Sequence, residues 1–234
     1  CRGEAFVKEL RELARGTVEY RKQHRIWVEG DHLLRAAMKR GVLPAIGVFS
    51  ESFWPLVPVQ YTQAAIKNIV ISDALYDSIS ALESPARMGF VFDLPGAPEF
   101  DGGQASVILD RVQDAGNVGA ILRSASAFGF RQIIALKGTA ALWSPKVLRA
   151  GMGAHWGLQL IEGAELALLN PLTIPMLVTS SHRGSYLHQL LSKREVTMPC
   201  VWALGHEGQG VSPELEARAS VHVRIAQPGG EESI

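Results

Sequence analysis

The sequence predicts an α/β protein whose larger, C-terminal part is built on a parallel sheet. Short apolar segments alternate with helix-like segments along the chain, which is the pattern of strands joined by helices. One apolar segment, residues 107–110, runs into a polar turn with glycine that opens a helix. A stretch rich in proline and glycine, residues 94–106, separates the two parts and reads as a linker.

The first part, residues 1–93, is expected to be a small α/β domain. Apolar residues at helical spacing predict helices, and short apolar runs predict strands. The expected helices cover residues 4–14, 31–40 and 72–82, and the expected strands cover residues 25–29, 45–49, 68–71 and 88–92. Asp31 is the expected N-cap of the second helix, and Gly41 ends it.

The second part, residues 107–234, is expected to form a parallel sheet covered by helices on both faces. Strands are expected at residues 107–110, 132–136, 157–161, 175–179, 199–204 and 221–225. Two Ser-Pro pairs, at residues 144–145 and 212–213, predict helix starts, because serine caps a helix and proline suits its first position. In open α/β sheets ligands collect at the carboxyl ends of strands, and the turn after residue 110 lies there.

The helix after this turn carries the first candidate site residues. Asn117 is expected to cap it, and Asp110 and Asp114 are expected to cap it or to pair with Arg111. Arg123 projects from a face rich in alanine and serine. A structural helix has little use for an arginine there, whereas a phosphate-binding site uses the guanidinium fork.

The amino-acid composition limits the classes of protein to which the chain can belong. The chain has 234 residues, 47% of them hydrophobic, and a net charge of +0. It has room for a real core, and its charge argues against general nucleic-acid binding. No apolar run approaches the ~18 residues of a membrane span, and no signal peptide is evident. Cys1 and Cys200 form neither a metal-binding nor a disulfide pattern, Cys200 reads as a core residue, and a cytoplasmic protein without a metal is expected. A start at Cys1 without methionine suggests that earlier residues are missing.

Two further segments make the functional interpretation specific. Residues 203–211, Ala-Leu-Gly-His-Glu-Gly-Gln-Gly-Val, follow an apolar run, and residues 223–234 close the sequence. Together with residues 107–130, and in this order, they resemble the three motifs of the SpoU (TrmH) family of RNA ribose 2′-O-methyltransferases in the SPOUT superfamily. The matching residues are Asn117 and Arg123 in the first motif, Gly205, Glu207, Gly208 and Gly210 in the second, and Ile225, Gly229, Glu231 and Ser233 in the third. The third motif departs from the family at Ala226-Gln227, where Pro-Met is usual, and ends at Ile234 before the family's final helix.

The resemblance implies a fold and an activity. It implies a trefoil knot in the C-terminal domain, with a C-terminal helix missing, and an L30e-like substrate-binding domain over residues 1–93. It implies S-adenosylmethionine as cofactor, structured RNA as partner, with rRNA favoured over tRNA, and a homodimer. Apolar residues for the dimer interface could be Leu142, Trp143 and Trp156, which otherwise belong to the core.

The resemblance also assigns residues. The expected catalytic residues are Asn117, Arg123, Glu207 and Ser233, and the expected cofactor-binding residues are Leu204, Gly205, Gly210, Ile225, Gly229 and Ile234. Arginine holds its proton too firmly to be a good base, so Arg123 is expected to clamp phosphate and stabilise developing alkoxide charge. Asn117 either binds substrate or caps its helix, and Glu207 either accepts a proton or organises the glycine loop. Basic residues of the first part either contact RNA or form a solvated helix face: Lys8, Arg11, Arg15, Arg21, Lys22 and Arg25.

Two other function classes are alternatives to an RNA methyltransferase. A knotted module that binds RNA or cofactor without turnover would fit the altered third motif and the neutral charge. A nucleotide-dependent oxidoreductase would need the dinucleotide fingerprint, which the sequence lacks, as it lacks a Walker lysine and the zinc-protease and hydrolase motifs.

Overall fold

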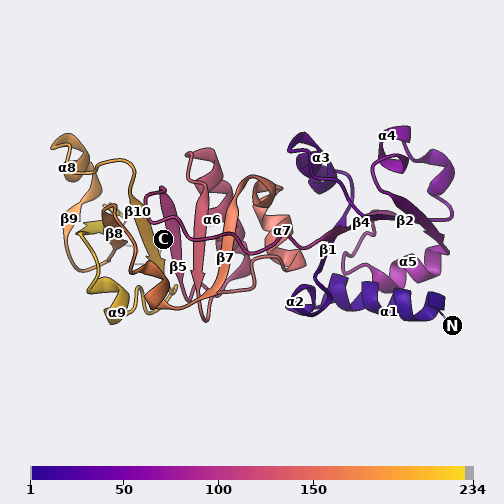
Figure 1. Cartoon of the computed structure of the whole chain (residues 1–234), viewed down its shortest axis with the longest axis horizontal. Coiled ribbons are helices and arrows are strands. Elements are labelled where there is room, and N and C mark those ends of the chain that lie inside the picture. The colour runs from indigo at the N-terminus through magenta and orange to yellow at the C-terminus, as the bar shows by residue number, and fades with distance from the viewer. Residues whose placement is uncertain (1, 230–234) are drawn as a thin grey trace. The chain divides into compact units, whose positions relative to one another are not determined.

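The computed structural model describes residues 2–229, which form two compact units (Figure 1). The first unit runs to Gly96 and also includes the segment Trp143–Trp156. The second unit consists of Ala97–Leu142 and the described chain from Gly157 onward. The first unit therefore includes a segment, residues 143–156, of the part that was expected to form the C-terminal domain. This segment is called the recruited segment below.

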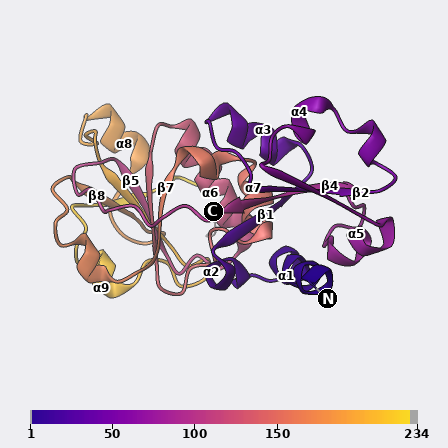
Figure 2. The same cartoon turned by 45° about the vertical axis from the view of Figure 1, so that its right-hand side comes forward.

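The first unit contains a four-stranded mixed sheet in the order β1-β4-β2-β3. Strand β4 is antiparallel to both of its neighbours, and β3 is parallel to β2. The strands are β1 (Arg25–Glu29), β2 (Ile46–Ser50), β3 (Lys67–Ile71) and β4 (Met88–Asp93). The helices are α1 (Arg2–Arg15), α2 (Glu19–Gln23), α3 (His32–Lys39), η1 (Trp54–Leu56), α4 (Val59–Thr62) and α5 (Asp73–Ile79). Figures 1 and 2 show α1, α2 and α5 on one side of this sheet and α3 and α4 on the other.

Strand β4 lies in the middle of the first unit's core. Five of its six residues are buried, because helices cover both faces of the sheet. Such a strand reads as a continuous apolar run rather than as an alternation. The recruited segment adds α7 (Pro145–Gly151), whose predicted cap is confirmed, since Ser144 Oγ accepts a hydrogen bond from the Val147 N–H at 3.4 Å.

The aromatic residues of the recruited segment belong to this core. The ring of Trp156 lies 4.7 Å from that of Phe92 and 5.5 Å from that of Trp143. Leu142 and Trp143 are both buried. The prediction that Leu142, Trp143 and Trp156 supply a dimer interface is therefore wrong for Leu142 and Trp143, and Trp156 has its ring packed inside the first unit.

The second unit contains a seven-stranded sheet in the order β7-β6-β5-β10-β8-β11-β9, with parallel pairs throughout the described strands. Its strands are β5 (Ser106–Asp110), β6 (Gln132–Leu136), β7 (Gln159–Ala164), β8 (Met176–Thr179), β9 (Ser185–Tyr186), β10 (Val201–Gly205) and β11 (Val221–Arg224). Its helices are α6 (Ala115–Ala127), η3 (Leu166–Leu169), α8 (Leu187–Ser192) and α9 (Pro213–Glu216), and η2 (Ala154–Gly157) ends at its border. The predicted α/β class, with a small mixed-sheet domain followed by a parallel sheet, is confirmed.

The strand order brings distant parts of the sequence together. Strand β10 lies directly beside β5, with Gly205 opposite Asp110 (Figure 1). Because the strands are parallel, the carboxyl ends of β5, β10 and β11 meet at one edge of the sheet, where ligands of α/β proteins bind. The chain is described only to Gly229, and the trefoil knot expected from the resemblance stays a prediction.

Several local features differ from the prediction. Asp31 occupies the N-cap position of α3 without making a cap hydrogen bond, and its carboxylate instead accepts from the Tyr61 hydroxyl and pairs with Arg35. Part of the expected linker is packed, because the Gln132 side chain makes two hydrogen bonds of 2.9 Å to the backbone of Asp101. Short elements such as α2, α4 and β9 have no counterpart in the prediction.

Cys200 is buried, as predicted, and burial raises the pKa of its thiol. Among the helices of residues 2–229, none combines the length and apolar character that a membrane crossing requires.

Candidate active site

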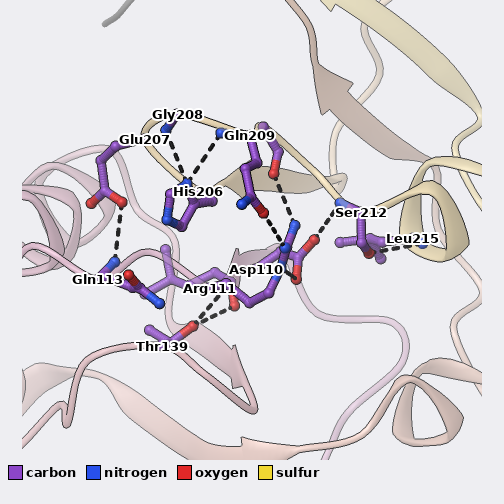
Figure 3. A network of polar contacts seen from close by, with 12 residues as sticks. Asp110, Arg111, Gln113, Thr139, His206, Glu207, Gly208, Gln209, Ser212 and Leu215 are labelled. Carbon is purple, nitrogen blue, oxygen red and sulfur yellow. Dashed lines mark hydrogen bonds and ion pairs between the residues drawn. The ribbon is translucent and has the colours of Figure 1, made fainter.

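Asp110 and Arg111 form the base of the site at the end of β5 (Figure 3). Asp110 is 3% exposed; its carboxylate accepts a hydrogen bond from the Ser212 N–H at 2.6 Å and pairs with Arg111 Nε at 3.3 Å. The predicted pairing of Asp110 with Arg111 is confirmed. Ser212 also caps α9 through the Leu215 N–H, as predicted, so Asp110 fixes the point where the chain leaves the second motif.

Arg111 clamps the glycine loop to the end of β5. Its backbone is in the left-handed region, at φ 62°, and its N–H donates to Thr139 Oγ1 at 3.1 Å. The guanidinium donates to Gln209 Oε1 at 2.9 Å and to the Gly210 carbonyl at 3.2 Å. Through its backbone and its side chain, Arg111 therefore joins three segments that lie far apart in sequence.

The glycine loop, residues 206–210, closes on itself. His206 and Gly210 exchange two backbone hydrogen bonds of 3.1 and 2.8 Å. The His206 imidazole stays inside the loop, where Nδ1 accepts from the N–H groups of Gly208 and Gln209 at 3.0 and 3.1 Å (Figure 3). A side chain at Gly205 would clash with the backbone of residues 210 and 211, and Gly210 has a φ of 69°. Glycine at these two positions is thus needed for the loop to form.

Glu207 links this loop to the start of α6. Its carboxylate accepts hydrogen bonds from the N–H groups of Gln113 (3.2 Å) and Asp114 (3.0 Å) and from Asn117 Nδ2 (3.3 Å). Burial acts to raise the pKa of Glu207, but these hydrogen bonds outweigh it and lower the pKa to about 2. A carboxylate with so low a pKa is a weak base, and its geometry is that of an organising group.

The N-cap of α6 is Asp114 and not Asn117. Asp114 Oδ1 accepts from the Asn117 N–H at 2.8 Å, and the helix begins at Ala115. The predicted cap of Asn117 is therefore wrong, because the helix starts earlier in the turn than expected. Asn117 lies inside the first turn, where its amide reaches Glu207, so residues of the first and second motifs are in direct contact.

Arg123 lies further along α6 and is exposed. The opposite face of the helix packs into the core through Val118, Leu122 and Ala125. Within residues 2–229 the guanidinium has neither a hydrogen bond nor an ion pair, and Asp110 and Asp114 bind other groups. The structure therefore does not support a salt bridge from Arg123 to either aspartate. Six residues of helix place Arg123 about 9 Å along the axis from Asn117.

The expected cofactor positions lie at the carboxyl edge of the sheet. Leu204 and Gly205 end β10 and are half-buried, and Gly210 is exposed. Ile225 follows β11 and is 44% exposed. Gly229 has open space where a side chain would be. Two expected site residues, Ser233 and Ile234, lie outside the described residues.

Some of the expected RNA-binding residues have structural partners in the first unit. Arg11 donates to the carbonyl and hydroxyl of Ser78, and Arg15 donates to the Ser80 carbonyl, so both cover the C-terminal end of α5. Lys8 pairs with Glu12 on the same helix. The remaining three residues are near α2 and β1: Arg21, which lies over the Tyr20 ring, Lys22, which is exposed, and Arg25, which is half-buried.

The sequence reasoning missed Arg111, Thr139 and His206 as site residues. Arg111 was identified only as a partner for an aspartate, and no sequence signal shows its positive φ or its reach to the loop. The position of His206 between glycines was visible, but its role as an acceptor depends on the closed loop. No group of three possible metal ligands is found within residues 2–229.

Comparison with known proteins identifies the family of the chain. Residues 104–234 match the SpoU rRNA Methylase family. This match covers more than half of the chain, and the chain belongs to the SpoU rRNA methylase family.

The sequence identity to individual relatives is modest. The chain is 31% identical over 156 residues to the human mitochondrial rRNA methyltransferase 3, covering 62% of this chain and 36% of the relative. It thus spans about a third of the length of that relative. It is 23% identical over 220 residues to the 23S rRNA (guanosine(2553)-2′-O)-methyltransferase RlmP of Bacillus subtilis, covering 92% of this chain and 85% of that protein.

Among solved structures, the fold is similar to that of the SpoU methyltransferase AviRb from Streptomyces viridochromogenes in complex with AdoMet. The TM-score is 0.81 at 18% identity, and the match covers 98% of this chain and 92% of that one. At this identity the likeness supports the fold alone.

Proposed function

We propose that this protein transfers a methyl group from S-adenosylmethionine to the 2′-hydroxyl of a ribose in structured RNA, with rRNA as the favoured substrate. The observation that carries the proposal is the contact between the first two motifs. Glu207 holds Asn117 and the backbone of residues 113 and 114 to the glycine loop, at the ligand-binding edge of the sheet. The names of the human and B. subtilis relatives, both rRNA methyltransferases, support rRNA over tRNA.

The cofactor site of this proposal lies between the ends of β10 and β11. The open backbone of Gly210 and Gly229 and the exposed side chain of Ile225 fit a ligand with a flat adenine ring. Leu204 and Gly205 complete the expected set, and Ile234 lies outside the described residues. S-adenosylmethionine would supply a methyl group activated by its sulfonium. AviRb, with the same fold, is described in complex with AdoMet.

Arg123 and Asn117 are the residues we propose to act on the RNA. Arg123 is exposed and carries no internal partner in the described chain, so its guanidinium can bind a phosphate beside the target ribose and stabilise negative charge that develops on the 2′-oxygen. Asn117 keeps its carbonyl oxygen for a substrate hydroxyl while its amide donates to Glu207. With its low pKa, Glu207 orders the loop and is not the proton acceptor.

The first unit is proposed to bind the RNA outside the target nucleotide. Lys22 and Arg25 are the better candidates for phosphate contacts, because Lys8 pairs with Glu12 and Arg21 donates to the Tyr20 hydroxyl. The guanidinium groups of Arg11 and Arg15 already donate to carbonyls of α5 or of its C-cap residue. To contact RNA, they would have to donate to a phosphate in addition to these carbonyls. A homodimer and a cytoplasmic location, both expected from the sequence, are further parts of the proposal.

Methyl incorporation tests the proposed function directly. Purified protein and tritiated S-adenosylmethionine are incubated with unmodified rRNA and, separately, with tRNA, and the labelled nucleoside is mapped by digestion and mass spectrometry. We expect a 2′-O-methylated ribose in rRNA. Cofactor binding by calorimetry without methyl transfer to either RNA would indicate a binding module instead.

A further inference from the structure

A stack of three flat side chains lies on the second unit, apart from the loops described above. The guanidinium of Arg224 is 4.3 Å from the centre of the Tyr186 ring. The imidazole of His188 is stacked on the same tyrosine, with ring centres 5.7 Å apart and an interplanar angle of 23°. Arg224 ends β11, Tyr186 ends β9 and His188 lies on α8.

The stack is held in place by the backbone. Strands β9 and β11 pair in parallel with Tyr186 opposite Arg224, which sets the ring and the guanidinium side by side. Arg224 Nε donates to the Gly184 carbonyl at 2.9 Å, which fixes the guanidinium plane. In the described part of the chain no carboxylate pairs with Arg224, and His188 is exposed.

The charge around the stack is mainly positive. Exposed His182 and Arg183 precede it, and exposed Lys193, Arg194 and Glu195 follow α8. Glu216 is engaged by Arg183 at 3.2 Å and lies 3.5 Å from the His222 imidazole. A flat, cationic and partly exposed surface of this kind suits a nucleobase attached to a phosphate backbone, since bases stack on aromatic rings and on arginine planes.

We propose that Tyr186, His188 and Arg224 form a stacking platform for a base of the RNA substrate, outside the methylated nucleotide. This inference rests on the proposed function, because it names a second contact for the same substrate. The platform lies at the carboxyl edge that also carries the glycine loop. Strand β9 is three strands from β10, a distance of about 14 Å at ~4.8 Å per strand. Roughly four stacked nucleotides span this distance at about 3.4 Å each.

The adenine of S-adenosylmethionine is the other possible nucleobase. Its sulfonium carries a positive charge, which the guanidinium of Arg224 repels, whereas an RNA strand brings phosphates that the guanidinium attracts. The experiment below titrates the RNA probes and S-adenosylhomocysteine separately, so the ligand whose binding a variant loses identifies the occupant of the stack.

The test compares two fluorescent probes, a 12-nucleotide oligoadenylate and an abasic 12-mer with the same sugar-phosphate backbone. Anisotropy titrations give the Kd of the wild type and of Tyr186→Leu, His188→Ala and Arg224→Lys. Tyr186→Phe keeps the ring, and His182→Ala removes a nearby exposed histidine that is not in the stack. Circular dichroism confirms that each variant is folded, and calorimetry with S-adenosylhomocysteine reports the cofactor site.

We expect the wild type to bind oligoadenylate more tightly than the abasic strand. Tyr186→Leu and Arg224→Lys should weaken oligoadenylate binding about 5- to 100-fold, the range measured for loss of one base-aromatic stack. His188→Ala should weaken it less, and Tyr186→Phe and His182→Ala should leave it unchanged. Binding of the abasic strand and of S-adenosylhomocysteine should not change in any variant.

Equal Kd values of wild type, His188→Ala and Arg224→Lys for oligoadenylate would overturn the platform, even if Tyr186→Leu failed to fold. Loss of S-adenosylhomocysteine binding with unchanged oligoadenylate binding would assign the stack to the cofactor and overturn it too. Both results differ from the result that would contradict the proposed function. That result is a wild-type protein that transfers no methyl group to RNA.

Discussion

Arg123 is the residue on which the proposed chemistry depends most. It is exposed and without an internal partner in the described chain, while Leu122 beside it is buried. We predict that Arg123→Ala changes the melting temperature by no more than about 1 °C, as is usual for surface substitutions. Methyl transfer should fall on the order of 100-fold, because a charge partner of the transition state is lost.

Three measurements on one preparation check this prediction: thermal melting, the Kd of S-adenosylhomocysteine and the rate of methyl transfer. Cofactor affinity should stay within about twofold of wild type, since Arg123 lies on α6 and not in the loops that end β10 and β11. Arg123→Lys is the matched variant that keeps the charge but not the fork. A folded Arg123→Ala variant with full activity would refute the catalytic role.

Glu207 predicts a particular dependence of stability on pH. Its pKa in the folded protein is about 2, below its usual value of 4.5, so the unfolded chain binds the proton more readily. The stabilisation from Glu207 is therefore fully present above about pH 4.5 and is lost as the pH falls toward 2. Because the side chain is exposed to solvent, we expect only about 0.5–1 kcal/mol.

Urea unfolding of wild type and Glu207→Gln between pH 3 and pH 7 measures this contribution, with pH values chosen from the shift in Glu207 pKa. The free energies of the two proteins should differ most at pH 7 and converge as the pH falls, because glutamine does not titrate. A constant difference over this range would show that hydrogen-bond geometry matters and the charge does not. The pH profile of methyl transfer above pH 5 should not contain a Glu207 titration.

At the level of elements, the start of α6 connects the fold to the site. Asp114 caps the helix through the Asn117 N–H, and the Glu207 carboxylate accepts from the Asp114 N–H. We predict that Asp114→Ala lowers the free energy of unfolding by about 1 kcal/mol, the usual cost of a lost N-cap. Asp114→Ser should recover most of this loss, because serine is also a good cap. Chemical denaturation followed by circular dichroism checks both variants. An Asp114→Ala variant with an unchanged free energy of unfolding would mean that water replaces the cap.

Sequence patterns predicted the long elements because their causes are local. Residues 25–29 form β1 as expected, since an apolar run between polar turns has few other stable conformations. The Ser-Pro pairs at 144–145 and 212–213 also begin helices, because capping and the fixed φ of proline act within one turn. Strand β9 could not be predicted, because two residues become a strand only by pairing with β11.

The sequence predicted candidate residues for the site but did not predict the contacts between them. The resemblance brought Asn117 and Glu207 into one site, and the structure joins them by a hydrogen bond of 3.3 Å. The clamp by Arg111 depends on a left-handed backbone and on β10 lying beside β5, neither of which is encoded in a local pattern. The wrong cap at Asn117 has a simpler cause, because Asp114 is an equally good cap three residues earlier.

At the scale of the whole molecule, the chain has equal numbers of acidic and basic residues, 23 of each. A protein without net charge gains little from long-range attraction to RNA, so its contacts must come from local groups such as Lys22, Arg123 and Arg224. Because of this balance of charge, we expect the protein to recognise RNA through few phosphate contacts. A stacking platform would add selectivity for bases, which contacts to phosphate charge cannot supply.

The proposed homodimer needs an interface other than the buried residues Leu142 and Trp143. In the described part of the second unit, several large apolar side chains remain exposed: Phe128, Leu191, Met198 and Ile225. Phe128, at the end of α6, is 78% exposed, the largest fraction of the four. Apolar and aromatic residues are typical of the centre of homodimer interfaces, and a stable one buries about 1,600 Å² or more in total.

We predict that light scattering at micromolar concentration gives about twice the 25.4 kDa mass of one chain. Phe128→Ser should weaken the dimer about tenfold or more, because buried aromatic residues carry much of the energy of an interface. Leu56→Ser is the matched control, since Leu56 is 72% exposed but lies in the first unit, and it should leave the dimer unchanged. A monomer in the wild type would refute the dimer itself, whereas a dimer that is insensitive to Phe128→Ser would move its interface to another surface of the second unit.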